Sequence, residues 1–301
     1  MINTYGPTNL AAHNKKNQIK ESFGYRAFVV CNTILMILIC IVTLYPFLYL
    51  VSQSFTSEQA IIAGHTGLIP EGFNIDTYKY VLTHDNFLGY YKNTVIYSVL
   101  GTVLSLITSA FLAYPLSKEE LKFNRVLTPF IVFTMYFGGG LIANYILITR
   151  LKLTNTMGGF ILPMMINTYY VLLMKSFFQS IPKDLEEAGE IDGLSKWGVF
   201  WRIALPLSKP IMATMTLFYS VLYWNNWFNA FLYLQDKAKW PVAYYLQTII
   251  RGTGQSDPDA VAVGSNIKSC AMVLTVLPII MIYPFVQKYY VQGMMLGGVK
   301  E

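Results

Sequence analysis

The stretch AFVVCNTILMILICIVTLYPFLYLVSQSFTS, residues 27–57, contains no Asp, Glu, Lys or Arg. Crossing the hydrocarbon core of a bilayer takes about 20 apolar residues in a helix. This stretch is long enough to cross, and it is too long for the apolar part of a cleavable signal peptide. A polar segment with four basic residues, residues 1–26, precedes it. The sequence therefore predicts an uncleaved first membrane span after a polar N-terminal tail.

Five further stretches also lack charge and are long enough to span, the last only just. They are residues 93–117, 126–149, 153–174, 210–235 and 269–287. Apolar residues make up 54% of the chain and charged residues only 13%, whereas a soluble globular protein has roughly 25% charged residues. Prolines inside several stretches are compatible with spanning helices, because neighbouring helices satisfy the freed backbone groups. The sequence predicts an all-α membrane protein with six transmembrane helices.

Lysine and arginine predict the orientation of these spans, because cytoplasmic loops are enriched in both residues. With the N-terminus inside, the inner segments carry 14 of the 22 Lys and Arg residues. We therefore expect a multi-pass protein of the bacterial plasma membrane with both termini in the cytoplasm. Residues 1–26 would be a cytoplasmic tail and residues 27–301 a single transmembrane domain. Its two substantial outer segments would be residues 58–92 and 236–268.

Several functions lack the residues that they require. No GxxxxGK[ST] phosphate-binding loop occurs, so we expect this chain itself to bind no ATP. Ion-coupled transporters usually place ionisable residues within the membrane, and the six stretches contain no Asp, Glu, Lys or Arg. A secondary, ion-coupled transporter is therefore the disfavoured alternative. No catalytic or metal-binding spacing stands out, and the basic residues form no patch with interleaved aromatics. We predict a non-enzymatic protein without a metal site, a cofactor of its own or a nucleic-acid partner.

The longest inner segment, residues 180–209, is more regular than a passive loop. Ser180 can cap a first helix that starts near Pro182. Gly193 is a typical stop signal for that helix. Ala188 and Gly189 give the helix a face of small residues, which another protein could approach closely.

A second short helix is expected directly after the first. Ser195 can cap its start and Pro206 is expected to end it. Spacing of i, i+3, i+4 and i+7 places four of its residues on one face: Trp197, Phe200, Trp201 and Ala204. Two interpretations of the whole inner segment are open on physical grounds, a docking site for another protein and an amphipathic helix on the lipid surface.

The inner segment also carries a recognisable motif. Glu187-Ala188-Gly189 is followed after three residues by Gly193, and after nine more by Ile203-Ala204-Leu205-Pro206. This spacing resembles the EAA signature of importer-type ABC permeases, E-A-A-x3-G-x9-I-x-L-P, and differs from it only at Gly189. The resemblance implies a type I ABC importer permease fold with a cytoplasmic coupling helix. It implies a coupling role for Glu187, Ala188, Gly189, Asp192, Gly193, Ile203, Leu205 and Pro206.

In that family the EAA segment docks on a cytoplasmic ATPase, and closure of the ATPases on ATP tilts the membrane helices. The resemblance therefore implies two copies of an ATPase subunit that bind ATP and Mg²⁺, a second permease subunit in a heterodimer with this chain, and an extracellular sugar-binding protein. Glu187 would anchor the ATPase, Ala188 and Gly189 would permit close contact, and Gly193 would be a hinge.

Other residues resemble the carbohydrate-uptake branch of these permeases. Leu205-Pro206-Leu207 is similar to the maltose-type proteins. Gly139-Gly140-Leu141-Ile142 and Trp224-Asn225 resemble a sub-branch that handles larger oligosaccharides. The likeness implies a permease subunit for oligosaccharide import.

The fifth stretch is rich in aromatic and amide side chains, which stack on sugar rings and hydrogen-bond to hydroxyl groups. On this interpretation the substrate pathway includes Tyr219, Tyr223, Trp224, Asn225, Asn226, Trp227 and Asn229. An aromatic belt at the outer membrane interface is an equally open interpretation. Tyr136, Tyr169 and Tyr170 could join either arrangement.

An acidic sugar is a further possibility for the substrate. The basic residues on the predicted outer side could attract anionic fragments. They are Arg150, Lys152, Lys239 and Arg251. Ordinary surface charge is the favoured explanation of these residues on the sequence alone.

Overall fold

The computed structural model describes the backbone of residues 22–83, 86–118, 120–251 and 266–298. Within these residues all regular secondary structure is helical, in agreement with the predicted all-α class. The chain divides into two compact units, residues 1–49 and residues 50–301. The predicted boundary between residues 26 and 27 does not coincide with this division.

The described part of the first unit is one apolar helix. Helix α1, Phe23–Phe55, begins four residues before the predicted span, within the segment predicted as a polar tail. The backbone N–H of Arg26 already bonds to the carbonyl of Ser22, at 3.1 Å. Over the first unit the large apolar side chains of α1 are exposed, as lipid-facing side chains are. The rest of the predicted tail, residues 1–21, lies outside the described residues.

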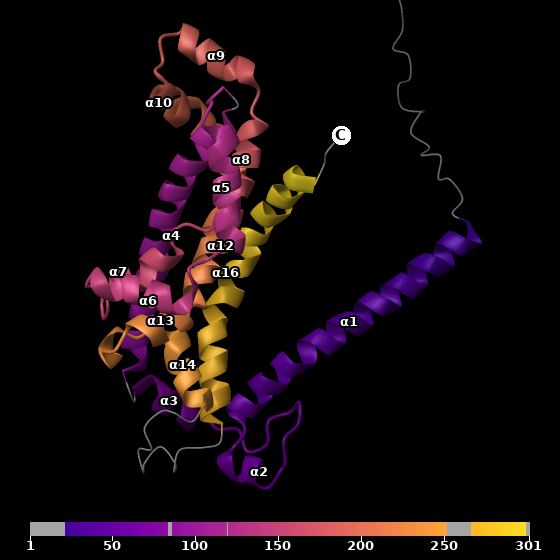
Figure 1. The fold of residues 1–301 in the computed structure, drawn as a ribbon. Helices are drawn as coiled ribbons and strands as arrows, with labels where there is room; N and C mark the ends of the chain where they lie inside the picture. Colours follow the sequence, from indigo (N-terminus) through magenta and orange to yellow (C-terminus); the bar gives the residue numbers. More distant parts are fainter. Residues whose placement is uncertain (1–21, 84–85, 119, 252–265, 299–301) are drawn as a thin grey trace, which may run out of the picture. The chain divides into compact units, whose positions relative to one another are not determined.

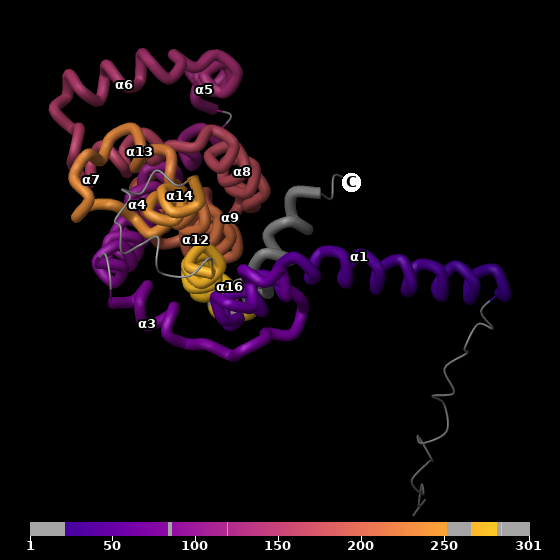
Figure 2. The backbone as a smooth tube through the Cα atoms, turned by 90° about the horizontal axis from the view of Figure 1, so that it is seen from below, coloured from indigo at the N-terminus to yellow at the C-terminus, as the bar shows by residue number. Residues whose placement is uncertain are grey.

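Four helices pack side by side in the second unit (Figures 1 and 2). They are α4 (Phe87–Ser117), α8 (Thr168–Gln179), α12 (Lys209–Trp224) and α16 (Ile267–Gly298). Helix α4 contacts both α8 and α12, and α12 also contacts α16. The apolar core lies among these helices, and it includes the fully buried Ala113, Met174 and Met215.

Further helical elements complete the second unit. They are α2 (Glu58–Ile62), α3 (Asp76–Thr83), α5 (Asn124–Tyr136), α6 (Gly140–Arg150), α7 (Met157–Ile161), η1 (Leu162–Met164), α9 (Lys183–Ile191), α10 (Lys196–Val199), η2 (Phe200–Ala204), α11 (Leu205–Leu207), α13 (Phe228–Tyr233), η3 (Lys237–Lys239) and α14 (Val242–Arg251). Helices α9 and α10 lie at one end of the unit, and α3 and α14 lie at the other (Figure 1). The predicted inner segment and the predicted outer segments therefore occupy opposite ends.

Two of the predicted spans are not single straight helices. By length and composition, α1 and α4 are each sufficient to cross a membrane, and the bent pairs α5–α6 and α7–α8 could add one span each. Helices α5 and α6 are bent by 107°, and Gly140 at the bend has a left-handed φ of +78°. The second pair is bent by 53°, where Asn167 accepts a hydrogen bond from the N–H of Tyr170 and starts α8. The predicted spans over residues 126–149 and 153–174 are therefore each built from two helices with a bend between them.

The fifth predicted span, residues 210–235, is also interrupted. Helix α12 ends at Trp224 and α13 begins at Phe228. In the gap, Oδ1 of Asn226 accepts a hydrogen bond from the N–H of Asn229, at 3.1 Å. A side-chain acceptor of this kind competes with continuation of the helix and restarts it in a new direction. The sixth predicted span lies within α16.

The α4–α12 contact is unusually close because one helix contributes a glycine. A Cβ atom at Gly101 would stand 2.7 Å from the ring of Tyr223. Hydroxyl groups then join the two helices, because Ser105 lies 2.9 Å from the hydroxyl of Tyr223 and Ser109 lies 2.7 Å from that of Tyr219. Polar pairs of this kind, together with small residues, hold membrane helices together.

Candidate functional site

Helix α9 begins differently from the prediction. Ser180 closes the preceding helix, since its hydroxyl donates to the carbonyl of Phe177 at 2.7 Å. Pro182 therefore occupies the position before α9, and the predicted N-cap at Ser180 is wrong. Asp184 and Glu186 lie in the first turn, where the positive end of the helix dipole favours carboxylates. The predicted stop is confirmed, because Gly193 adopts a left-handed φ of +86° directly after the helix.

The second helix of the inner segment forms with a wider turn in its middle. Ser195 caps α10 as predicted, and its Oγ accepts from the N–H of Gly198 at 3.2 Å. The chain then passes through the π-helical turn η2 into α11. Pro206 lies in the first turn of α11 instead of ending the helix. Proline is tolerated there because its missing N–H would have no partner in any case.

The residues predicted to share one face differ in burial. Phe200 and Ala204 are buried, whereas Trp197 and Trp201 are more than half exposed. All three aromatic rings nevertheless meet Phe111 of α4, with ring centroids 5.6–5.8 Å from it. The predicted common face is therefore confirmed for the aromatic residues.

Phe200 is the anchor of the inner segment. Its ring lies 4.9 Å from that of Tyr114 in α4 and 6.4 Å from that of Phe178 in α8, centroid to centroid. Burial of a whole aromatic side chain stabilises such a contact by about 1.5–3 kcal/mol. The inner segment is thus attached firmly to α4 and α8.

Gly189 faces the interior of the segment. A Cβ atom there would stand 2.4 Å from Cδ1 of Ile203. The motif residues Gly189 and Ile203 therefore pack against each other, and the small size of Gly189 serves this internal contact. Gly189 is buried within its own chain, and its role in the close approach of a partner stays a prediction. Leu205 is half-buried and Pro206 is exposed.

The opposite face of α9 is open. Glu187, Ala188 and Asp192 are exposed, and Ile191 is 85% exposed. Glu187 forms no ion pair with a described residue. An apolar side chain beside an unpaired carboxylate and an alanine is an arrangement suited to contact with another protein.

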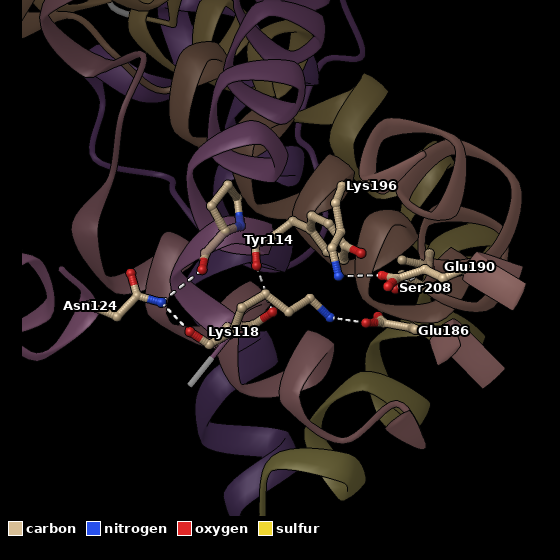
Figure 3. A network of polar contacts seen from close by, with 10 residues as sticks. Tyr114, Lys118, Asn124, Glu186, Glu190, Lys196 and Ser208 are labelled. Carbon is tan, nitrogen blue, oxygen red and sulfur yellow. Dashed lines mark hydrogen bonds and ion pairs between the residues drawn. The ribbon is translucent and has the colours of Figure 1, made fainter. Parts of the chain in front are cut away.

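A network of ion pairs lies on the inner face of α9 (Figure 3). Glu186 pairs with Lys118 at the end of α4, and Glu190 pairs with Lys196. The Lys118 ammonium also stands 4.4 Å from the centroid of the Tyr114 ring. The hydrogen bond from Lys196 to Glu190 raises the pKa of Lys196, which is largely exposed. Sequence reasoning missed the Lys118–Glu186 pair, because its members lie 68 residues apart.

The fifth-span residues divide into two groups. Tyr219 and Tyr223 are buried, and their hydroxyl groups bond to Ser109 and Ser105 of α4. Tyr223 also donates to the carbonyl of Ile161 at 3.2 Å. Both tyrosines join helices and neither is among the groove residues, so their place in a substrate pathway stays a prediction.

Trp224, Asn225 and Asn226 line a groove of about 730 Å³ along α12. Other lining residues come from α8, α16 and the 3₁₀ turn, including Tyr170, Ile279 and Met164. The indole N–H of Trp224 donates to the carbonyl of Thr275 at 3.3 Å, which fixes the ring. The groove therefore combines apolar walls with amide groups at one end.

Two further predicted residues lie beside the groove without lining it. The Asn229 amide donates to the carbonyl of Phe160 at 3.3 Å. The Trp227 ring is covered by the guanidinium of Arg251, 4.7 Å from the ring centroid. Tyr136 and Tyr169 are exposed and are not among the groove residues.

No set of three or more His, Cys, Asp or Glu side chains within the described ranges is placed to hold a metal ion. The buried Cys270 donates its thiol to the carbonyl of Ser54 at 3.2 Å. The chemistry that remains is that of contact surfaces, the open face of α9 at one end and the groove along α12.

Comparison with known proteins gives a consistent result. The sequence profile of the family "Binding-protein-dependent transport system inner membrane component" matches residues 101–296. The chain is 40% identical to Protein LplC of Bacillus subtilis, over 91% of this chain and 95% of that protein. It is 37% identical to the polygalacturonan/rhamnogalacturonan transport system permease protein YtcP of the same species, over 87% of this chain and 93% of that protein.

A solved structure shares the fold. It is a chain of a bacterial ABC transporter involved in the import of the acidic polysaccharide alginate, with a TM-score of 0.84 and 32% identity. The match covers 90% of this chain and 99% of that chain. The predicted type I permease fold is thereby confirmed, and the alternative of an ion-coupled secondary transporter is not supported. The chain belongs to the family of binding-protein-dependent transport system inner membrane components and is a non-catalytic permease subunit of an ABC importer.

Proposed function

We propose that this permease subunit couples ATP hydrolysis by a partner ATPase to the uptake of an oligosaccharide, and that α9 is the element that docks on the ATPase. The open face of α9 carries this proposal. Glu187 would bind a basic or hydrogen-donating group of the ATPase, while Ala188 and Ile191 would fill an apolar recess. ATP and Mg²⁺ would be held by the ATPase, because the sequence of this chain has no phosphate-binding loop.

The partners follow from this role. The assembly would contain this chain, a different second permease subunit, two ATPase subunits and an extracellular sugar-binding protein. The placement of α9 opposite to α3 and α14 supports an arrangement in which the ATPase and the binding protein act at opposite ends (Figure 1). Both termini of the chain would then lie in the cytoplasm, on the side of α9.

The groove along α12 would form part of the sugar pathway. Trp224 offers an aromatic face for a sugar ring, and Asn225 and Asn226 offer amide groups for its hydroxyls. Closure of the ATPases would move α9 together with α4 and α8, because Phe200 and the Lys118–Glu186 pair attach it to them. That movement would change access to the groove.

Acidic oligosaccharides are the substrates that we favour. The relatives described above are named for polygalacturonan and rhamnogalacturonan and for the acidic polysaccharide alginate. In this chain, Arg251 is exposed over the ring of Trp227, the residue that follows Asn225 and Asn226 of the groove, and it pairs with no carboxylate among the described residues. An exposed guanidinium next to an aromatic ring can bind a uronate while the ring contacts the sugar.

Purification of the tagged chain from its native membranes tests this function. After mild detergent extraction, mass spectrometry should find a second permease and an ATPase in twofold excess over this chain. Oligogalacturonate should compete with uptake more effectively than a neutral oligosaccharide of equal length. Recovery of the chain without an ATPase, from membranes that express one, would refute the coupling role. Equal competition by the neutral sugar would refute only the preference for acidic substrates.

A further inference from the structure

The ion pair between Lys118 and Glu186 is more buried than the pair between Lys196 and Glu190 in the same segment. The Lys118 side chain is 24% exposed and that of Glu186 only 12%. In contrast, the Lys196–Glu190 pair is 74% and 37% exposed. Oε1 of Glu186 is buried and has no hydrogen-bond partner among the described residues, so Lys118 is the counter-charge that makes burial of this carboxylate tolerable.

The ion pair connects elements that are not neighbours in the chain. Glu186 lies in α9, which is linked covalently to α8 and α10, whereas Lys118 caps the C-terminal end of α4. Asn124 extends the connection to α5, because its Nδ2 donates to the carbonyls of Pro115 and Lys118 (Figure 3). Side-chain contacts therefore link α9 to the junction of α4 and α5.

The far part of this connection reaches the groove. Helix α4 is joined to α12 by the Ser109–Tyr219 and Ser105–Tyr223 hydrogen bonds. Helix α12 continues directly to Trp224, which lines the groove. A contiguous set of contacts thus runs from the inner face of α9 along α4 to the groove, and such a set can carry a displacement between two sites.

We propose that Lys118 and Glu186 are positioning residues that make α4 move with α9, and that through this ion pair the displacement imposed by the ATPase reaches the groove along α12. This inference rests on the proposed docking role of α9. It assigns separate tasks to two adjacent residues: Glu187 holds the ATPase from outside, and Glu186 holds α4 from inside. Without the pair, the ATPase would still bind and hydrolyse ATP, but the groove would respond less.

A reporter inside the groove tests the proposal without any sugar. Val221 lines the groove and is exposed, so Val221→Cys can be labelled with a membrane-impermeant maleimide after Cys31, Cys40 and Cys270 are replaced by Ser. In the complete transporter, ATP with vanadate should change the labelling rate by about tenfold. Glu186→Gln and Lys118→Gln should each reduce this change to about twofold or less. The amount of co-purified ATPase should stay the same in both variants.

Rescue separates positioning from simple damage to the fold. The exchange Lys118→Glu with Glu186→Lys, and the conservative Lys118→Arg, should each restore at least half of the ATP-dependent change. Lys196→Gln, which breaks the exposed pair, should leave it unaltered. A full response in Glu186→Gln, or a Lys118→Arg variant as unresponsive as Lys118→Gln, would overturn the proposal. An unmodified transporter that lacks the ATPase or shows no ATP-dependent change would instead refute the proposed function itself.

Discussion

The inner segment, which contains α9 to α11, and the α12–α13 region use similar side chains in opposite ways. In the inner segment the motif residues Glu187 and Ala188 are exposed, while the buried Phe200 packs against Tyr114 of α4. In α12 the tyrosines predicted to meet a ligand, Tyr219 and Tyr223, attach the helix to α4, while their neighbours from Leu217 to Trp224 line a groove.

The comparison shows that the type of a residue in a membrane helix does not determine which way its side chain points. Aromatic and hydroxyl side chains join helices where there is no water, because each polar group needs a partner within the protein. Outside the membrane exposed charge is cheap, so a carboxylate such as Glu187 can stay on the surface without a partner among the described residues. Substitutions in α9 and in α12 that separate side chains facing a partner from side chains joining helices are therefore the sharpest tests.

Glu187→Arg should have the largest effect. Reversal of a charge at a docking surface costs about 2–5 kcal/mol of binding free energy. Because roughly 2 kcal/mol corresponds to a thirtyfold change, ATP hydrolysis coupled to transport should fall at least thirtyfold. Fluorescence-detected size exclusion should show unchanged membrane insertion. Glu120→Arg, an exposed carboxylate on the same side, is the matched control. Wild-type coupling in Glu187→Arg would contradict the assignment of α9.

Gly189→Leu should destabilise the inner segment by about 1–3 kcal/mol, because the added side chain overlaps Ile203. Thermal unfolding of the detergent-solubilised transporter measures this loss. Gly189→Ala is the matched variant and restores the residue of the family motif. Its single methyl group meets only the flexible end of Ile203, so we expect little change. Equal behaviour of both variants would show that Gly189 does not pack internally.

Trp224→Ala and Tyr219→Phe separate the two groups of aromatic residues in α12. Loss of the Trp224 ring from the groove should raise the sugar concentration for half-maximal uptake by about threefold to tenfold. Tyr219→Phe should leave that concentration unchanged and should lower stability by about 1 kcal/mol through loss of its hydrogen bond to Ser109. The opposite pattern would place Tyr219 in the sugar pathway.

Lys196→Gln should have the smallest effect, because an exposed ion pair contributes about 1 kcal/mol or less. The pKa of Lys196 is raised by its hydrogen bond with Glu190. The contribution of the pair is therefore fully present below the usual lysine pKa and is lost only as the pH rises through the raised value. The difference in thermal unfolding between the two proteins should therefore be small and constant from about pH 6 to pH 9. A pH-dependent difference within this range would show that the pair is more buried than its exposure indicates.

The sequence by itself determined the features that depend on local physical chemistry. Long uncharged stretches predicted an all-α membrane protein, because each needs only its own composition to favour lipid. The stop at Gly193 and the cap at Ser195 were predictable, because they depend on one residue and its immediate neighbours. The docking role of α9, in contrast, is implied by the resemblance to the EAA motif and stays a prediction.

Only the tertiary structure decided which way side chains point and where helices break. The 107° bend between α5 and α6, the burial of Tyr219 and the contact of Gly189 with Ile203 each depend on elements that meet after folding. The Lys118–Glu186 pair joins residues 68 positions apart, and no local pattern distinguishes it from other lysines and glutamates. Packing between distant helices sets these contacts. They cannot be read from the local sequence, because the residues that form them come together only when the chain folds.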